Sequence, residues 1–251
     1  MMSSQDSAVF RLEHISVAYS HEGGLHAVLE DVDFSLEPGQ HVGLYGPNGS
    51  GKTTLFRCIT GLLQPRQGIV RFHGRAARTE SDFHALRCKV GFVLQHAEDQ
   101  LFFPTVLEDV AFGPLNLGYA PEKARETALR TLRDLGLAGF EDRQTHRLSG
   151  GEKKLVSLAT VLAMQPEALL LDEPTNGLDR EARQRLTDIL CGLDTARIVI
   201  SHDWDFLSRV CDSYMTIREG RLVACAPDFR HSHTHIHPRG NEPHWHLDSP
   251  E

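Results

Sequence analysis

Residues 46–53 have the composition and spacing of a loop that binds phosphate. The segment reads Gly46-Pro47-Asn48-Gly49-Ser50-Gly51-Lys52-Thr53, and Thr54 follows it. Because glycine has no Cβ, several main-chain N–H groups of such a loop can turn toward one phosphate. The loop follows a short apolar run, residues 41–45, and opens an expected helix whose N-terminus adds positive potential. The pattern predicts that Lys52 reaches the β- and γ-phosphates of a nucleotide and that Thr53 holds Mg²⁺.

Two carboxylates at the end of an apolar run complement this loop. The run Leu169-Leu170-Leu171 is followed by Asp172 and Glu173. Ligands of an open parallel sheet lie beyond the carboxyl ends of its strands, so both carboxylates are expected at that edge. There Asp172 would hold Mg²⁺ through its water shell, and Glu173 would polarise an attacking water. A solvated strand end is the alternative, and the presence of a phosphate loop in the same chain favours catalysis.

A second helix start, at residues 148–152, is also suited to phosphate. It reads Leu148-Ser149-Gly150-Gly151-Glu152. Ser149 is a good N-cap, and the helix predicted for residues 151–164 carries apolar side chains along one side. A single nucleotide already has its phosphate loop at residues 46–53. The economical interpretation is that the second helix start faces a nucleotide held by another copy of the chain.

Apolar runs alternate with helical patterns along most of the chain, which indicates an α/β fold. We predict strands at residues 9–19, 28–36, 41–45, 69–72, 89–94, 168–171, 197–201, 214–218 and 221–224. We predict helices at residues 52–63, 121–135, 151–164 and 180–193, and a short helix from residue 203. Apolar strands separated by helices indicate a parallel sheet that helices cover. The β-rich start is expected to form an antiparallel lobe, and residues 96–164 a helical lobe.

The composition is that of a folded globular protein. Of the 251 residues, 40% are hydrophobic, and the formal net charge is −8. An acidic chain lacks the basic surface expected of a general nucleic-acid binder, so we expect no nucleic-acid partner. No apolar run approaches the roughly 20 residues that span a bilayer, and the first residues do not resemble a signal peptide. Five widely spaced cysteines suit a reducing compartment, and the chain is expected to be cytoplasmic.

In its motifs and their order the chain resembles the ATP-binding cassette (ABC) ATPases. The family signature LSGGQ appears as residues 148–152, with Glu152 in place of glutamine. In that family two subunits enclose two ATP molecules, each between the phosphate loop of one subunit and the signature of the other. The resemblance covers residues 8–226 and implies a P-loop NTPase fold with a RecA-like parallel core sheet. It also implies ATP and Mg²⁺ as cofactors, ATP hydrolysis, and a second ATPase subunit, which would make a homodimer.

Four further positions match family motifs individually. The resemblance implies that Gln95, at a strand end, contacts Mg²⁺ and the attacking water and couples hydrolysis to a transport partner. It implies that His202 contacts the γ-phosphate and that Asp179 lies in a loop across the dimer seam. Tyr19 is similar to the aromatic residue that stacks on adenine, although a strand-end tyrosine that only packs is an equal alternative.

Residues 95–116 are similar to one branch of the family, the ATPase subunits of energy-coupling-factor importers, above all those for cobalt and nickel. This resemblance implies a transmembrane coupling subunit, a substrate-binding membrane subunit, and a peripheral position on the cytoplasmic face of the membrane. Leu101, Phe102 and Phe103 form a patch suited to docking an amphipathic helix, or else belong to the core of the helical lobe. Leu155 departs from the branch, which usually has a basic residue there.

The end of the chain, residues 227–251, is expected to be a histidine-rich tail without a packed structure. It contains His231, His233, His235, His237, His244 and His246. Imidazole is a good ligand for nickel and cobalt, so we predict weak metal binding there. A solvated polar tail and an engineered tag are the alternatives.

The sequence leaves three functional classes to compare. The favoured one is the transport ATPase, and it would carry nickel or cobalt. The others are a soluble ABC ATPase without a membrane partner and a metal-handling NTPase that delivers metal to an enzyme. The third would account for the tail, but it does not account for residues 148–152.

Overall fold

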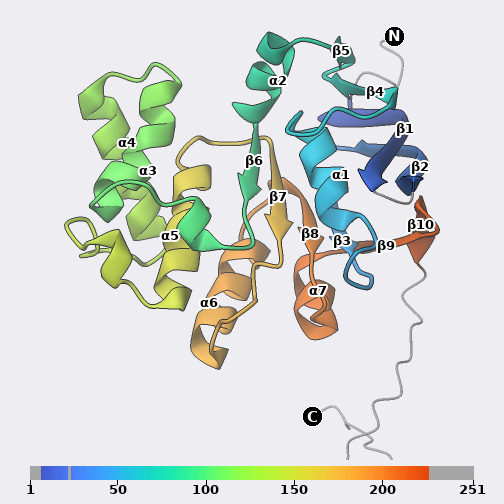
Figure 1. Ribbon diagram of the computed structural model, residues 1–251. Helices are drawn as coiled ribbons and strands as arrows, with labels where there is room; N and C mark the ends of the chain where they lie inside the picture. Colours follow the sequence, from blue (N-terminus) through green and yellow to red (C-terminus); the bar gives the residue numbers. More distant parts are fainter. Residues whose placement is uncertain (1–6, 22–23, 226–251) are drawn as a thin grey trace, which may run out of the picture.

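The structure, a computed structural model, describes residues 7–21 and 24–225, which form two sheets, with a helical lobe beside the larger one (Figure 1). The strands are β1 (Phe10–His21), β2 (Gly24–Leu36), β3 (His41–Leu44), β4 (Gln67–Phe72), β5 (Arg75–Ala77), β6 (Val90–Val93), β7 (Ala168–Asp172), β8 (Ala196–Ile200), β9 (Ser213–Arg218) and β10 (Arg221–Cys225). The α-helices are α1 (Lys52–Ile59), α2 (Glu80–Arg87), α3 (Val106–Asn116), α4 (Pro121–Asp134), α5 (Gly150–Leu162), α6 (Arg180–Cys191) and α7 (Trp204–Val210).

The larger sheet has the strand order β10-β9-β3-β8-β7-β6. All neighbours in it pair in parallel except the β9–β10 hairpin, which is antiparallel. Every residue of β7 and β8 is buried because helices cover both faces of the sheet. Along β7, Ala168 and Leu170 face the core that contains α1, whereas Leu169 and Leu171 face the core formed with α5 and α6. The carboxyl ends of β3, β6, β7 and β8 therefore meet along one edge.

The smaller sheet is antiparallel and has the order β2-β1-β4-β5. Its strands β1 and β2 pair from Phe10 with Leu36 to His21 with Gly24, with several register shifts that mark bulges. Apolar residues of this sheet pack on α1 and share one core with the α1 face of the larger sheet. This packing brings β1 and β2 beside the loop that precedes α1.

The helical lobe consists of α3, α4 and α5, which lie at the far side of the larger sheet from the antiparallel sheet (Figure 1). Helix α3 begins with a capping box between Thr105 and Glu108, and α4 begins with Pro121, as predicted. Helix α4 ends at Asp134, and Gly136 follows its C-cap with a φ of +64°. Within the described residues, no helix has the length and apolar character to cross a membrane.

The predicted fold class is confirmed: a parallel core sheet, an antiparallel β lobe and a helical lobe are all present. Several boundaries were wrong: the helices predicted for residues 52–63, 151–164 and 180–193 end at Ile59, Leu162 and Cys191, and the strand predicted for residues 28–36 begins at Gly24. The first helix stops because Gly61 takes a φ of +71° and lies against Phe83, where a Cβ would come within 2.3 Å of the ring. The sequence analysis missed α2 and β5. The predicted tail, residues 227–251, lies outside the described residues.

Candidate nucleotide-binding site

The loop between β3 and α1 curls tightly beside the antiparallel sheet. Gly46, Gly49 and Gly51 all have positive φ, at +155°, +79° and +102°. At Gly51 a Cβ would lie 2.9 Å from Cγ1 of Val28 and 3.1 Å from its carbonyl oxygen. Only glycine fits that position without a shift of β2. The absence of a side chain at Gly51 therefore lets the loop lie directly against β2.

A cavity of about 370 Å³ lies in front of this loop. Its lining contains eleven of the residues predicted for the site: Tyr19, Asn48, Gly49, Gly51, Lys52, Thr53, Thr54, Gln95, Asp172, Glu173 and His202. The lining also contains three residues that sequence analysis did not select: Val28, Asn176 and Ile200. Gly46, Pro47 and Ser50 instead line a different hollow, behind the loop, together with Trp204 and Tyr214. One cavity thus collects side chains from β1, α1 and the ends of β6, β7 and β8.

Lys52 is 6% exposed, and its ammonium group is directed back over the loop. Its Nζ donates hydrogen bonds to the carbonyl oxygens of Gly46, at 2.7 Å, and Pro47, at 2.8 Å. Burial lowers the pKa of Lys52, and the nearby carboxylates of Glu173 and Asp172 oppose that shift. A cation held over the phosphate loop by main-chain oxygens can exchange those oxygens for phosphate oxygens without leaving the loop.

Thr53 and Asp172 meet at the base of the cavity, although 119 residues separate them. The Thr53 hydroxyl donates to Oδ2 of Asp172 at 2.9 Å. Asp172 is 3% exposed, and burial raises its pKa, against the Thr53 hydrogen bond and the charge of Lys52. A hydroxyl and a carboxylate side by side offer the oxygen ligands that Mg²⁺ prefers, so these residues fit that ion.

Glu173 follows Asp172 with a φ of +46°, a strained conformation for a residue other than glycine. Its main-chain N–H donates to the carbonyl of Ile200 at 2.9 Å, which attaches it to the end of β8. Its Oε1 lies 3.2 Å from Nε2 of His202, and its Oε2 accepts from the main-chain N–H of His202 at 3.4 Å. Burial raises the pKa of Glu173, and the charge of His202 opposes this.

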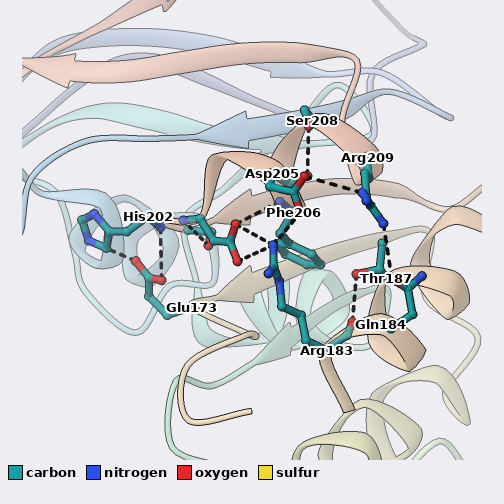
Figure 2. A network of polar contacts seen from close by, with 11 residues as sticks. Glu173, Arg183, Gln184, Thr187, His202, Asp205, Phe206, Ser208 and Arg209 are labelled. Atoms are coloured by element: carbon teal, nitrogen blue, oxygen red, sulfur yellow. Dashed lines mark hydrogen bonds and ion pairs between the residues drawn. The ribbon is translucent and has the colours of Figure 1, made fainter. Parts of the chain in front are cut away.

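His202 is held by contacts on both sides. Its Nε2 lies 2.8 Å from Oδ1 of Asn48 in the phosphate loop. The next residue, Asp203, caps α7 and accepts a hydrogen bond at 2.8 Å from Arg183 of α6. Arg183 also donates to Asp205 at 2.8 Å. Figure 2 shows the Glu173 carboxylate facing His202, and the Arg183 guanidinium with its partners on the far side of His202. Helix α6 thereby fixes the segment that carries the histidine.

Tyr19 lies at the rim of the cavity, at the end of the antiparallel lobe. Its hydroxyl is 3.3 Å from Oγ1 of Thr54. The ring lines the cavity beside Val28. A planar side chain at this place can contact a nucleotide base that projects from the loop.

Besides Gly46, Pro47 and Ser50, five further predicted residues are not in this cavity: Ser149, Gly150, Gly151, Glu152 and Asp179. Ser149 and Glu152 cap α5 reciprocally, with Glu152 N–H to Ser149 Oγ at 3.2 Å and Ser149 N–H to Glu152 Oε2 at 2.8 Å. Asp179 caps α6 by accepting from Ala182 N–H at 2.8 Å. A Cβ at Gly151 would lie 2.9 Å from that of Ala182, so the two helix starts are adjacent. They form a second polar surface, away from this chain's own phosphate loop.

The six tail histidines lie outside the described residues. In the part of the chain that the structure describes, one group has the composition of a metal site: His14, Asp31 and Asp33. Their ligand atoms lie within 4.8 Å of one another on the exposed surface of the antiparallel sheet. They are far in sequence from the tail and were not among the predicted ligands.

Comparison with known proteins gives a consistent picture. Residues 29–176 match the family model described as ABC transporter. A putative ABC transporter ATP-binding protein of Nitratidesulfovibrio vulgaris is 53% identical over 230 residues, which are 92% of this chain and 84% of that protein. The energy-coupling factor transporter ATP-binding protein EcfA of Methanothermobacter thermautotrophicus is 41% identical over 85% of this chain and 70% of its own length.

Solved structures of ATP-binding cassettes have the same fold as this chain. CbiO1 of Clostridium perfringens, described as part of the ABC transporter complex CbiONQ, superposes with a TM-score of 0.76 at 31% identity, over 86% of this chain and 87% of that one. The dimeric ATP-binding cassette MJ0796, in a post-hydrolysis state with ADP and phosphate, superposes with a TM-score of 0.76 at 27% identity, over 85% and 96%. The chain belongs to the ABC transporter ATP-binding family, and it is an ATP-binding and ATP-hydrolysing transporter subunit.

Proposed function

We propose that this chain is the ATPase subunit of an energy-coupling-factor importer and powers uptake of a transition-metal ion, nickel or cobalt. The observation that carries the transport role is an apolar groove beside Leu94 that contains a buried carboxylate with one unpartnered oxygen among the described residues. The likeness to EcfA and to CbiO1 supports the importer class. The histidine-rich end of the chain supports a metal as the transported ion.

The cavity residues have distinct roles in ATP hydrolysis. Lys52 binds the β- and γ-phosphates, and the main-chain N–H groups of residues 46–51 surround the phosphates. Thr53, Asp172 and Gln95 would hold Mg²⁺, and the bound ion would supply positive charge for the phosphoryl oxygens. Glu173 accepts a hydrogen bond from the attacking water and orients it in line with the γ-phosphorus. His202 donates to a γ-phosphate oxygen, and Tyr19 stacks on the adenine.

A second copy of the chain completes each site. Ser149, Gly150, Gly151 and Glu152 would contact the nucleotide bound by the other copy, and Asp179 would lie across the seam. Their place outside this chain's own cavity supports that assignment. The N-terminus of α5 would then direct its positive potential at the other copy's γ-phosphate. A homodimer with two shared ATP sites is the simplest arrangement of one chain type.

The groove that we assign to a membrane partner lies between the helical lobe and the edge strand β6. It has a volume of about 290 Å³ and contains Leu62, Phe102 and Phe112, which are 62%, 73% and 42% exposed. Leu101 and Phe103, predicted to share this exposed patch, are partly buried and pack within the lobe. Exposed apolar side chains gathered in a groove indicate a docking surface for an apolar helix face.

Asp109 gives this groove a preference for a basic side chain. It is 4% exposed, and its Oδ1 accepts from the main-chain N–H groups of Phe102, at 2.8 Å, and Phe103, at 3.1 Å. Its Oδ2 has no hydrogen-bond partner among the described residues. Burial raises the pKa of Asp109. A lysine or arginine on the docked helix would remove the cost of this unpartnered oxygen.

Gln100 connects the groove to the nucleotide site. Its Oε1 accepts from the main-chain N–H of Leu94 at 3.1 Å, and its Nε2 donates to the carbonyl of Ser157 at 2.9 Å. Leu94 directly precedes Gln95, which lines the ATP cavity. A helix that moves in the groove would therefore move the residue before Gln95.

The chain would work at the cytoplasmic face of the membrane. It would be bound through this groove to a transmembrane coupling subunit, with a substrate-binding membrane subunit beside it.

Co-purification tests the proposal. The full chain, tagged at its N-terminus in its native host, is isolated in mild detergent, and its partners are identified by mass spectrometry. We expect membrane subunits to co-purify with the wild type and the Glu126→Gln control, and Asp109→Asn and Phe102→Ser to lose them. Absence of membrane subunits from every preparation would reject the transport role. Nickel and cobalt uptake, measured as cell-associated metal with and without the chain, tests the substrate.

A further inference from the structure

Lys154 is a buried cation that the roles above do not use. It lies on α5, four residues after Gly150, and is 7% exposed. Burying an ammonium group is costly unless hydrogen-bond acceptors surround it. Burial lowers the pKa of Lys154, whereas the carboxylates of Asp172 and Glu173 raise it.

The acceptors of Lys154 are main-chain carbonyl oxygens from two strand ends. Its Nζ donates to the carbonyl of Leu94 at 3.4 Å, to that of Gln95, and to that of Glu173 at 3.5 Å. An ammonium group has three N–H donors, so one lysine can supply all three carbonyls. The adjacent Lys153 points elsewhere and pairs with Glu98 at 3.0 Å.

These carbonyls belong to the residues that carry the proposed chemistry. Strands β6 and β7 are parallel neighbours, and Val93 pairs with Leu171, so Gln95 and Glu173 follow adjacent strand ends. Lys154 reaches both ends from the helix that covers them. Its side chain thus fixes the distance between the two main-chain segments and the start of α5.

Glu173 in particular needs such support. Its positive φ is a strained conformation, which persists only when neighbouring groups hold it. The end of β8 holds its N–H through Ile200, and its carbonyl accepts from Lys154 and, at 3.2 Å, from Asn176 N–H. Without Lys154 the carbonyls of Gln95 and Glu173 would lose a charged donor, and both side chains could shift.

We propose that Lys154 is a positioning residue, which sets Gln95 and Glu173 of its own chain for ATP hydrolysis. This inference rests on the proposed roles of those two residues. The helix that carries Lys154 is also the helix whose N-terminus, in the proposed dimer, faces the nucleotide of the other copy. It is independent of the membrane partner, because ATP hydrolysis by the isolated chain is the measurement.

Steady-state ATPase assays on the full chain test the proposal. Lys154→Met removes the ammonium but keeps an apolar stem of similar length. We expect its kcat to fall at least about tenfold, with the KM for ATP and the affinity for ADP within about twofold of wild type. Lys154→Arg, which keeps a charged donor, should recover part of the kcat. Lys153→Met is the matched control, on the same turn of α5, and should stay within about twofold of wild type.

Mixed dimers show which of the two composite sites the Lys154→Met substitution impairs. Mixing Lys154→Met with Ser149→Arg leaves one composite site with an intact Gln95, Glu173 and Ser149, so activity should exceed that of either variant alone. A kcat for Lys154→Met within twofold of wild type would overturn the proposal. So would an equal loss in Lys153→Met, or a mixed dimer without recovery. If Lys154→Met does not fold, Lys154→Gln replaces it, and an intermediate kcat at unchanged KM is expected.

Discussion

Glu173 and His202 contact each other through both the side chain and the main chain of the histidine. Nε2 of His202 lies 3.2 Å from Oε1 of Glu173, and the His202 N–H donates to Oε2 at 3.4 Å. The two residues follow β7 and β8, neighbouring parallel strands that pair from Ala168 with Ala196 to Asp172 with Ile200. The sheet thus places a buried carboxylate and an imidazole together in the lining of the candidate nucleotide cavity. This pair can orient water and contact the γ-phosphate from one position.

The Glu173→Gln variant should bind ATP but hydrolyse it very slowly. The substitution removes the carboxylate that we propose orients the water, and it leaves Lys52, Thr53 and Asp172 in place. We expect kcat to fall on the order of 10²-fold or more, with ATP affinity preserved. Light scattering should show that the variant accumulates as an ATP-bound dimer. Turnover close to that of wild type would remove Glu173 from this role.

The same variant should be more stable than wild type at neutral pH. The pKa of Glu173 is raised in the folded chain, with burial as the largest cause, so the folded state binds its proton more tightly than the unfolded state. Ionisation above the raised pKa therefore disfavours folding, and stability rises as pH falls through that value. Glutamine carries no charge at any pH. The midpoint of thermal unfolding should be higher for Glu173→Gln at pH 7.5, and the difference should shrink toward pH 5. A lower midpoint at pH 7.5 would contradict this account.

The part of the cavity that the loop before α1 lines could be predicted because its residues are consecutive. Residues 48–53 lie in one strand–loop–helix unit, and their geometry follows from the glycines and the helix start. Val28 and Asn176 could not be found this way, since only the packing of β2 and the turn after β7 brings them to the cavity. Lys154 has a weak signal, a lysine on the face of α5 that carries Leu158 and Val161, but its acceptors are set by tertiary structure.

Helix α2 shows why a short element of the fold could not be predicted from the sequence. It has eight residues and only Phe83 and Leu86 buried, so its apolar repeat is too short to be recognised. Its start did carry a signal, because Thr79 and Asp82 form a capping box.

Asp109 shows a different limit of prediction from sequence. An acid on a helix is normally expected at the surface, and its burial depends on the approach of the Phe102 and Phe103 main chain.

Ser149→Arg should abolish ATPase activity and leave nucleotide binding at residues 46–53 largely intact. Ser149 lies outside this chain's own cavity, so its replacement should damage only the site of the other copy. A large cation at the start of α5 would also remove the N-cap that Glu152 N–H uses. Binding of a fluorescent ATP analogue and phosphate release separate the two effects.

A mixture of Ser149→Arg and Lys52→Ala should regain activity. In the mixed dimer one site combines an intact Lys52 with an intact Ser149, whereas neither parent dimer has such a site. The expected activity is up to about a quarter of wild type if the chains mix randomly, since about half the dimers are mixed and each has one good site of two. Each variant alone is the control. A soluble mixture without recovery would count against the shared site.

The histidine-rich tail should bind nickel or cobalt without being needed for ATP hydrolysis. His231, His233, His235 and His237 are spaced two apart, and His244 and His246 repeat the spacing. Several imidazoles on one chain can reach one ion, although ordering the chain around it costs entropy and keeps the affinity modest. Ordinary histidine titrates near pH ~6.5, and the metal needs the neutral ring, so binding should fall below about pH 6.

Calorimetric titration with nickel at pH 7.5 checks this, with the full chain and a full-length variant in which all six tail histidines are asparagine. The surface group of His14, Asp31 and Asp33 is a second place where an ion could bind, so His14→Asn is the control for metal bound outside the tail. We expect the tail variant to lose most of the bound nickel and to keep its ATPase rate, and His14→Asn to keep both. If the tail variant binds as much nickel as the wild type, the tail is not the ligand. The proposal of a metal substrate then loses the support that this chain's own residues give it.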